Sequence, residues 1–508
     1  MTYPGADRRH RLLDADAPRP GISGTAYDTA WLASVPAQDD LRASRFPSSL
    51  RWLTENQLSD GSWGSPVQYA HDRILCTLAA VTPLAQFGRR AEDRDAVAAG
   101  TRYLWRHAAT VSAHSTELVG FDLLLPTLVQ RARDASISLP PQLDTYTNRR
   151  ARRLAYLPPE ALYSPRGSLV RSLEFLGPRA SLPGLRAAQG ANGAIGNSPA
   201  ATAFYLAGSN DSRALEYLNS ALDRTGGAMA PVLHPCETFE LLWAAYHLHL
   251  GGIPTRRLLT PIERAFLRSA LAAGGVSLSP SFPIPDADHT ALAILLLDAV
   301  GDEVDPTVLR AFATPEGHFA NYAYGRQSEA GVGLNLHVLH ALSRLPGCPD
   351  VEQTIDRLVA YLATSHTGEY WMDRWHVSPY YATAHAICIF DDLSAQQSRP
   401  VAHLVERSRE WIRQTQNPDG SWGFYGQPTA EETAYGLLAL TSGRVLDEAD
   451  EARCAAAARY LERVGDADLP PLWIDKCLYT PPLVVRAAIA AARTLYARRS
   501  QAASPETV

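Results

Sequence analysis

The segment Gln57-Leu58-Ser59-Asp60-Gly61-Ser62-Trp63-Gly64 recurs near the other end of the chain as Gln416-Asn417-Pro418-Asp419-Gly420-Ser421-Trp422-Gly423. A weaker copy spans residues 189–195. In each strong copy the glycine permits a tight turn, and the tryptophan can pack against the next unit. A turn repeated at fixed offsets indicates stacked helix–turn–helix units. We therefore expect two related helical domains, with the Gln, Gly and Trp residues holding helices together.

Helical periodicity dominates the segments between these turns. Phe239, Leu242, Trp243, Tyr246 and Leu250 recur at i, i+3, i+4, i+7 and i+11, which places them on one face of a helix. Alternation with a period of two residues is hard to find, and proline or glycine interrupts the chain every few tens of residues. The sequence predicts an all-α protein.

Composition narrows the class of protein. The 508 residues are 46% hydrophobic and 20% charged with a net charge of −6, which is ordinary for a globular protein and does not favour a nucleic-acid binder. The N-terminus has no apolar signal-peptide core, and the apolar run at 291–297 is far too short for a membrane span. The six cysteines form no Cys-x-x-Cys pair. We expect a cytoplasmic protein without an integral membrane segment.

An acidic segment, Pro285-Asp286-Ala287-Asp288-His289-Thr290-Ala291, opens one of the apolar helices. Two carboxylates at i and i+2 before a helix can be N-terminal caps. They can also include a carboxylic acid in an apolar cavity, where burial favours the protonated form. Such an acid could deliver its proton to a weak base, even an alkene. The spacing alone leaves both interpretations open.

The motifs of several other enzyme classes are absent. The chain has no Gly-x-Gly-x-x-Gly or P-loop pattern, no His-Glu-x-x-His cluster and no Gly-x-Ser-x-Gly elbow. It does have 10 Trp, 21 Tyr and 12 Phe residues. Aromatic faces stabilise cations through their quadrupoles. A helical, aromatic-rich chain with an acidic turn suits carbocation chemistry.

Several further segments occur in a characteristic order. They are Ser23–Trp31, Val119–Pro126, Ser172–Leu176, Pro235–Trp243, Trp371–Tyr381 and Trp473–Pro481. Together with the repeated Gln-x-x-x-Gly-x-Trp turns, the QW motifs of that family, they resemble the class II terpene cyclases, particularly the shorter bacterial diterpene cyclases. The resemblance covers nearly the whole chain.

The acidic segment resembles the family's Asp-x-Asp-Asp-Thr-Ala signature. The resemblance makes Asp288 the acid that protonates the substrate, with Asp286 and His289 as neighbours that tune it. His289 stands where the family has a third acid, and related triterpene cyclases also lack an acid there. The departure puts the hydrogen-bond partner of the catalytic acid in doubt.

The resemblance also implies the reaction. The class I motif Asp-Asp-x-x-Asp is absent, because the segments at 39–43 and 391–395 both lack the final acid. This implies protonation-initiated cyclisation of geranylgeranyl diphosphate to a bicyclic diterpenyl diphosphate that keeps its diphosphate. It further implies two α-barrel domains with the active site between them: a γ domain at 45–255 inserted into a β domain at 1–44 and 256–508.

Substrate and metal contacts follow from the same alignment. Arg153 and Arg374 fall where copalyl-type members carry diphosphate-binding lysines, and Lys476 is a weaker third candidate. Asp122 aligns with a glutamate that the family uses to contact Mg²⁺, and Glu117 is a candidate second carboxylate. For each of these residues the alternative is a solvated surface charge.

The terminating step differs from that of copalyl-type members. Their deprotonating His and Asn are replaced by Arg171 and Val232, and neither is a convincing base. We therefore expect the final cation to be quenched elsewhere, with His376, Tyr380 and Tyr381 as candidates whose alternative role is core packing.

Rival interpretations remain at this point. A farnesyl diphosphate cyclase giving a drimane-type product uses the same chemistry. A squalene-type cyclase is disfavoured because the chain is short and has few QW repeats. A non-catalytic helical scaffold that only binds prenyl diphosphates stays open because of His289. The oligomeric state also stays open, with a homodimer as one arrangement.

Overall fold

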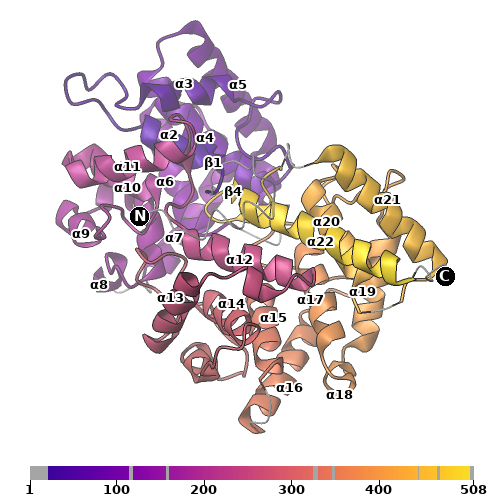
Figure 1. Cartoon of the computed structure of the whole chain (residues 1–508). Helices are drawn as coiled ribbons and strands as arrows, with labels where there is room; N and C mark the ends of the chain where they lie inside the picture. The colour runs from indigo at the N-terminus through magenta and orange to yellow at the C-terminus, as the bar shows by residue number, and fades with distance from the viewer. Residues whose placement is uncertain are drawn as a thin grey trace.

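The structure is a computed structural model that describes residues 21–113, 118–155, 159–323, 330–345, 349–443, 445–465 and 469–503 (Figure 1). The helices (α, and η for 3-10) and strands are, in chain order, β1 (Gly24–Thr25), α2 (Ala26–Ala33), α3 (Pro47–Glu55), α4 (Ala70–Phe87), α5 (Ala91–His107), η1 (Ala108–Ala113), α6 (Phe121–Asp134), η2 (Pro141–Thr145), α7 (Tyr146–Ala155), α8 (Pro159–Leu162), η3 (Ser168–Arg179), α9 (Leu182–Ala187), α10 (Pro199–Ser209), α11 (Ser212–Arg224), β2 (Ala230–Pro231), α12 (Glu237–Leu250), η4 (Thr255–Arg257), α13 (Pro261–Ala272), α14 (Ala287–Asp298), η5 (Pro306–Phe312), α15 (Val332–Ser343), α16 (Pro349–Thr364), α17 (Pro379–Asp392), α18 (Ala395–Ser398), α19 (Ala402–Gln414), α20 (Ala430–Thr441), α21 (Glu448–Val464), β3 (Trp473–Ile474), β4 (Leu478–Tyr479) and α22 (Pro482–Ala503). The predicted all-α class is confirmed.

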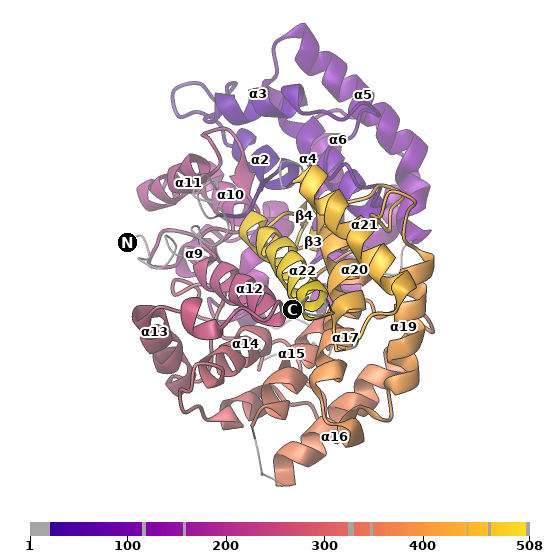
Figure 2. The same ribbon diagram turned by 45° about the vertical axis from the view of Figure 1, so that its right-hand side comes forward.

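The helices of the described residues form two closed rings (Figures 1 and 2). In the N-terminal ring, α2 packs on α4, α4 on α6, α6 on η3, η3 on α10, and α10 back on α2. In the C-terminal ring, α12, α14, α15, α17, α20 and α22 pack in that order, and α22 returns to α12. These rings are the inner layers of the two predicted α-barrels.

Burial explains which helices lie inside each ring. Every residue of α20 is buried, and α14 is buried from Ala287 to Leu297. A helix that is apolar around most of its circumference must be covered on all sides. The outer helix α11 instead buries Ala214, Tyr217, Leu218 and Ala221, which share one face at helical spacing. Its opposite face meets solvent.

Each repeated turn is hydrogen-bonded to two neighbouring outer helices. Gln57 Nε2 donates to Gly61 O at 2.8 Å and to Ala96 O of α5 at 2.9 Å, while Trp63 Nε1 donates to Leu53 O of α3 at 2.7 Å. The second copy makes equivalent bonds from Gln416 to Gly420 and Arg453, and from Trp422 to Ile412. Both turn glycines have φ near +90°. The predicted structural role of these motifs agrees with these contacts.

Two short antiparallel pairs lie where the rings meet. Strand β1 pairs with β2, and β3 pairs with β4 to form a hairpin at 473–479. Ser23 N–H donates to Thr480 O at 2.8 Å, and Ile474 N–H donates to Trp375 O at 2.8 Å. The hairpin therefore contacts segments from both ends of the chain.

Two helices pack in a different ring from their predicted domain, and the domain boundaries themselves stay a prediction. Helix α2, predicted within the β domain, packs in the N-terminal ring against α4 and α10. Helix α12, predicted within the γ domain, packs in the C-terminal ring against α14 and α22. In the described residues, no helix is both long and apolar enough to cross a bilayer.

Candidate active site

A cavity of about 680 Å³ lies between the two rings. Ile22, Arg171 and Leu233 line it from the N-terminal part of the chain, while α12, α14, the 371–381 segment and the β3–β4 hairpin supply most of the remaining wall. Seven aromatic residues face it: Phe239, Trp243, Tyr322, Trp375, Tyr381, Trp473 and Tyr479. The aromatic faces suit a cationic guest.

Asp286 and His289 form one unit at the start of α14. Asp286 is the N-cap: its Oδ1 accepts the His289 backbone N–H at 2.9 Å. The same carboxylate lies 2.8–2.9 Å from His289 Nδ1. His289 Nε2 has no hydrogen-bond partner among the described residues, and the ring lies 4.8 Å from that of Trp243. The capping interpretation of the acidic segment thus holds for Asp286.

Asp288 also lines the cavity but has a different partner. Its Oδ1 lies 2.6 Å from Nδ1 of His337, which projects from the middle of α15. Asp288 is 6% exposed and His337 is 0% exposed. When Nδ1 donates to Oδ1, the second oxygen of the carboxyl group is left to carry a proton.

Buried aromatic and imidazole rings surround His337. Tyr246 and His385 lie with their ring centroids 4.8 Å and 5.4 Å from it. Burial holds the pKa of His385 well below its usual value and lowers that of His247 to about 3. Buried rings therefore enclose the imidazole that contacts Asp288.

A second carboxyl group, Asp373, lies in the cavity wall. It accepts the Gly333 N–H at 2.8 Å and the Trp375 N–H at 3.0 Å. Burial raises its pKa, and the nearby Asp288 raises it further. Asp373 belongs to the Trp371–Tyr381 segment, but the resemblance gave it no role. His337 was not predicted because no local motif distinguishes it from Asn335 and His340, the other polar residues near it on α15.

An ion pair between residues far apart in the sequence, Arg171 and Asp475, also lies in the cavity wall. The Arg171 guanidinium forms an ion pair with the Asp475 carboxylate, and both residues line the cavity. Tyr322 lines it beside them, and burial raises its pKa to about 12 although Arg171 lowers it. Val232 is fully buried and is not among the lining residues.

Known proteins with similar sequences and structures identify the family of this chain. Residues 327–463 match the squalene-hopene cyclase C-terminal domain. The type B diterpene cyclase of Mycobacterium tuberculosis is 30% identical over 95% of this chain and 97% of its own. The labda-7,13-dienyl diphosphate synthase of Streptomyces clavuligerus is 32% identical over 98% and 94%. The chain belongs to the class II diterpene cyclases. The solved ent-copalyl diphosphate synthase from Streptomyces platensis superposes on this cyclase with a TM-score of 0.78, at 27% identity, over 97% and 100% of the two chains.

In this cyclase, Asp122 and Arg153 lie together. Arg153 Nη1 donates to Asp122 Oδ1 at 2.6 Å, with side chains 34% and 16% exposed. Asp122 sits in the first turn of α6, just after Val119, whose N–H donates to Asp475 O at 3.0 Å. The predicted pair is therefore close to the hairpin that borders the cavity. Glu117 lies outside the described residues.

Arg374 lies between two residues of the cavity wall, Asp373 and Trp375. Its guanidinium carbon is 5.6 Å from the centre of the Trp375 ring. Arg374 is thus next to the cavity in the sequence, and its contact with the diphosphate stays a prediction.

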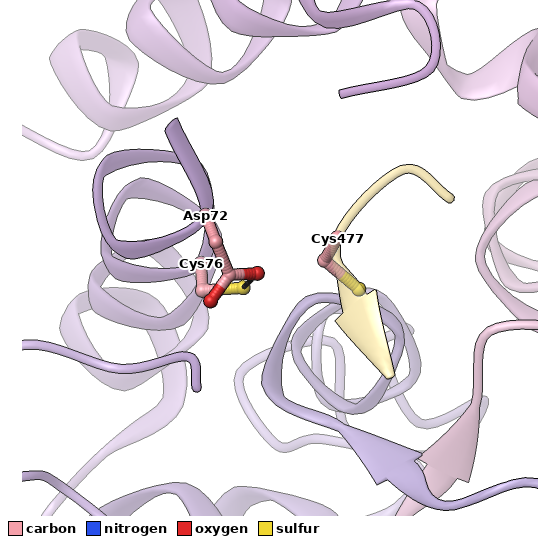
Figure 3. A group of neighbouring side chains, drawn as sticks. All are labelled: Asp72, Cys76 and Cys477. Atoms are coloured by element: carbon pink, nitrogen blue, oxygen red, sulfur yellow. Dashed lines mark hydrogen bonds between the residues drawn. The ribbon is translucent and has the colours of Figure 1, made fainter. Parts of the chain in front are cut away.

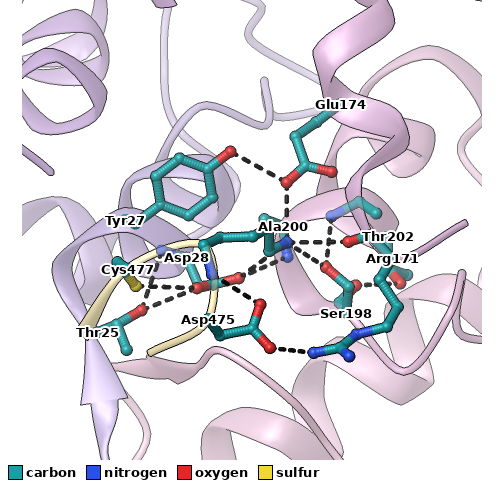
Figure 4. A network of polar contacts seen from close by, with 12 residues as sticks. Thr25, Tyr27, Asp28, Arg171, Glu174, Ser198, Ala200, Thr202, Asp475 and Cys477 are labelled. Carbon is teal, nitrogen blue, oxygen red and sulfur yellow. Dashed lines mark hydrogen bonds and ion pairs between the residues drawn. The ribbon is translucent and has the colours of Figure 1, made fainter. Parts of the chain in front are cut away.

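Lys476 lies in a buried polar network, and Figure 4 labels its partners Glu174, Ser198 and Asp28. Its Nζ donates to Glu174 Oε1 at 2.8 Å, Ser198 Oγ at 2.6 Å and Arg171 O at 3.1 Å, and lies 3.8 Å from Asp28 Oδ1. Burial lowers its pKa, but Glu174 and Asp28 more than offset this and the pKa is raised. The network joins the hairpin to the N-terminal ring, and Lys476 is not among the residues lining the cavity.

Of the three candidates for the terminating step, only Tyr381 lines the cavity. Its hydroxyl accepts the Trp243 indole N–H at 3.0 Å. His376 is held by Glu431 and Ser378, and Tyr380 donates to Thr415, so both serve the packing of the C-terminal ring. Neither of these two lines the cavity.

Proposed function

We propose that this class II diterpene cyclase converts geranylgeranyl diphosphate into a bicyclic diterpenyl diphosphate. The observation that carries the proposal is the buried carboxyl group of Asp288, held by His337 at 2.6 Å in a cavity lined by aromatic rings. The names of the two relatives that match over nearly the whole chain, a diterpene cyclase and a labdadienyl diphosphate synthase, favour a C20 substrate. They favour neither a farnesyl diphosphate cyclase nor a non-catalytic scaffold.

The chemistry begins with proton transfer from Asp288 to the terminal alkene of the substrate. The remaining tertiary cation is attacked by the next alkene, and a second closure completes the bicycle. Phe239, Trp243 and Trp473 present faces or edges to this region without offering a strong nucleophile. Loss of a proton from the final cation restores neutrality, so the overall reaction is an isomerisation.

Cations at the edge of the cavity hold the diphosphate in this proposal. Arg153 and Arg374 can each grip phosphate oxygens with two parallel N–H bonds. Asp122 fits Mg²⁺ because it is a partly exposed oxygen donor, and Mg²⁺ keeps several waters and usually binds one or two carboxylates plus substrate phosphates. When bound, Mg²⁺ would neutralise diphosphate charge.

A cytoplasmic location completes the proposal. The five cysteines that the structure describes are all free and buried, as expected in a reducing compartment. The possible homodimer stays open.

Incubation of the purified protein with C15 and C20 prenyl diphosphates, followed by phosphatase treatment and product analysis, tests the assignment. We expect a bicyclic C20 alcohol only after phosphatase, with no stoichiometric pyrophosphate during turnover. Asp288→Asn is the matched control: it should fold, by circular dichroism, and form no product. A cyclic product from the C15 substrate alone would favour the drimane-type rival, and normal turnover by the Asn variant would remove Asp288 from the mechanism.

A further inference from the structure

A second meeting point of the two rings holds two thiols and a carboxylate outside the active cavity. Asp72 and Cys76 lie one turn apart on the same face of α4, and Cys477 lies in the β3–β4 hairpin. Figure 3 shows the three side chains as neighbours, with Asp72 and Cys76 on one helix and Cys477 on the hairpin. One ligand atom of each residue lies within 4.8 Å of the others, and all three residues are buried, at 0%, 1% and 0% exposed.

We propose that Asp72, Cys76 and Cys477 form a Zn²⁺ site that joins the N-terminal ring to the hairpin. Two sulfur donors with one carboxylate oxygen are a donor set that Zn²⁺ accepts and that Mg²⁺ and Ca²⁺ do not favour. Zn²⁺ is usually four-coordinate, so a water molecule takes the remaining position. This site is separate from the Mg²⁺ that Asp122 is proposed to hold.

The carboxylate is already held in place for such a role. Asp72 Oδ2 accepts the Ser65 N–H at 2.7 Å, and Oδ1 accepts the Leu478 N–H at 2.8 Å. Each oxygen retains a further lone pair for a metal ion. Outer bonds of this kind fix the orientation of metal ligands. Gly64 leaves the necessary room, because a Cβ there would lie 2.3 Å from Asp72 Oδ2.

A route for an ion also exists. A second cavity, of about 640 Å³, borders the cluster and is lined by Gly64, Ser65, Cys76 and Leu478, among others. It shares no lining residue with the active cavity. A metal ion and its water can therefore reach Cys76 without passing the catalytic acid.

The competing interpretation is a set of hydrogen-bonded thiols. Cys76 Sγ lies 3.5 Å from Asp72 Oδ1, and Cys477 Sγ lies 4.0 Å from Asp28 Oδ2. These contacts satisfy two weak donors but leave the convergence of both sulfurs on one carboxylate unexplained. A disulfide between the two cysteines is the other competing arrangement.

The position of Cys477 gives the site a consequence for catalysis. Its neighbours in the hairpin, Trp473, Ile474, Asp475 and Tyr479, line the active cavity. A metal ion linking Cys477 to α4 would restrict the movement of this wall. The proposal does not depend on the substrate assignment, since metal binding is measured without any substrate.

The test uses the full-length protein, purified under reducing conditions and stripped with a chelator. We expect one equivalent of Zn²⁺ to rebind, and one equivalent of Co²⁺ to give sulfur-to-metal charge-transfer absorption. X-ray absorption of the Zn²⁺ form should show sulfur at about 2.3 Å. Cys76→Ser and Cys477→Ser should lose the absorption, while Cys454→Ser, which changes a buried thiol of α21, should keep it.

The wild-type measurements decide the matter even when a variant fails to fold. Absence of stoichiometric Zn²⁺ and of the Co²⁺ absorption in folded wild-type protein would overturn the proposal. So would a Co²⁺ band that persists in folded Cys477→Ser, or a Cys76–Cys477 disulfide found by mass spectrometry in protein that binds no Zn²⁺ after reduction. Asp72→Asn should weaken Zn²⁺ binding by roughly tenfold or more.

Discussion

His337 Nδ1 lies 2.6 Å from Asp288 Oδ1, and this contact joins two inner helices, α14 and α15, at the wall of the active cavity. An alkene is a very weak base, so the acid must be protonated and yet ready to release its proton. An imidazole N–H that donates to one carboxyl oxygen stabilises the carboxylate that forms when the other oxygen releases its proton. The contact therefore supplies the hydrogen-bond partner that the missing third acid of the signature left in doubt.

Replacing His337 should slow the chemical step. His337→Phe removes the donor while keeping a ring of similar size, and we expect kcat to fall by about 10²–10³-fold with little change in KM. His337→Gln retains a donor and should recover part of the loss. Steady-state kinetics with product quantification provides the measurement. Unchanged kcat in a folded Phe variant would show that Asp288 needs no such partner.

His289→Asp should retain measurable cyclisation. The exchange recreates the family signature and leaves both Asp288 and His337 in place. It also replaces the His289–Asp286 contact of 2.8 Å with two neighbouring carboxyl groups, so we expect a lower rate rather than a higher one. The rate of product formation, with circular dichroism as the folding control, tests this. Complete loss in a folded variant would assign His289 an essential role in the reaction.

The diphosphate assignment predicts a split between binding and chemistry. Arg153→Ala and Arg374→Ala should mainly raise KM because each removes a charge-assisted contact. Asp122→Ala should raise the Mg²⁺ concentration needed for half-maximal rate. Arg133→Ala is the matched control, since Arg133 lies on the same helix as Asp122 but pairs with Asp144 at the surface. Full activity in excess chelator, or a control variant as impaired as the others, would contradict the assignment.

The helical architecture could be predicted because the motifs that specify it are short, contiguous segments that occur more than once in the chain. The Gln57 and Gln416 turns make the same hydrogen bonds in the two rings, so either copy reports on both. Asp288 could be proposed from the sequence for a similar reason, since it belongs to a contiguous motif at a helix start, and the structure places it in the cavity wall.

Residues that meet only through the fold were not predicted. His337 reaches Asp288 across 49 positions, and Arg171 reaches Asp475 across 304. Lys476 lies in a segment that resembles the family, but the sequence does not show that its side chain is buried. Its partners Glu174 and Ser198 come from the N-terminal ring.

The buried pair of His247 and His385 predicts a pH dependence of stability. The two Nε2 atoms lie 3.2 Å apart, and burial lowers the pKa of His247 to about 3. In the unfolded chain a histidine has a pKa of about 6.5. Below about pH 6.5 the unfolded chain therefore binds a proton at His247, whereas the folded protein does not. The contribution of His247 is fully present above about pH 6.5 and is lost progressively toward pH 3.

His247→Asn removes this titration. The stability of the wild type relative to the variant should therefore be greater at about pH 7.5 than at about pH 5, by on the order of 2 kcal/mol. Thermal unfolding of both proteins at the two pH values measures the difference. Asp302→Asn is the control, because its ion pair with Arg264 lowers the pKa of Asp302 and the group stays ionised across this range. An equal difference between wild type and His247→Asn at both pH values would mean that His247 takes up a proton in the folded protein as readily as in the unfolded chain.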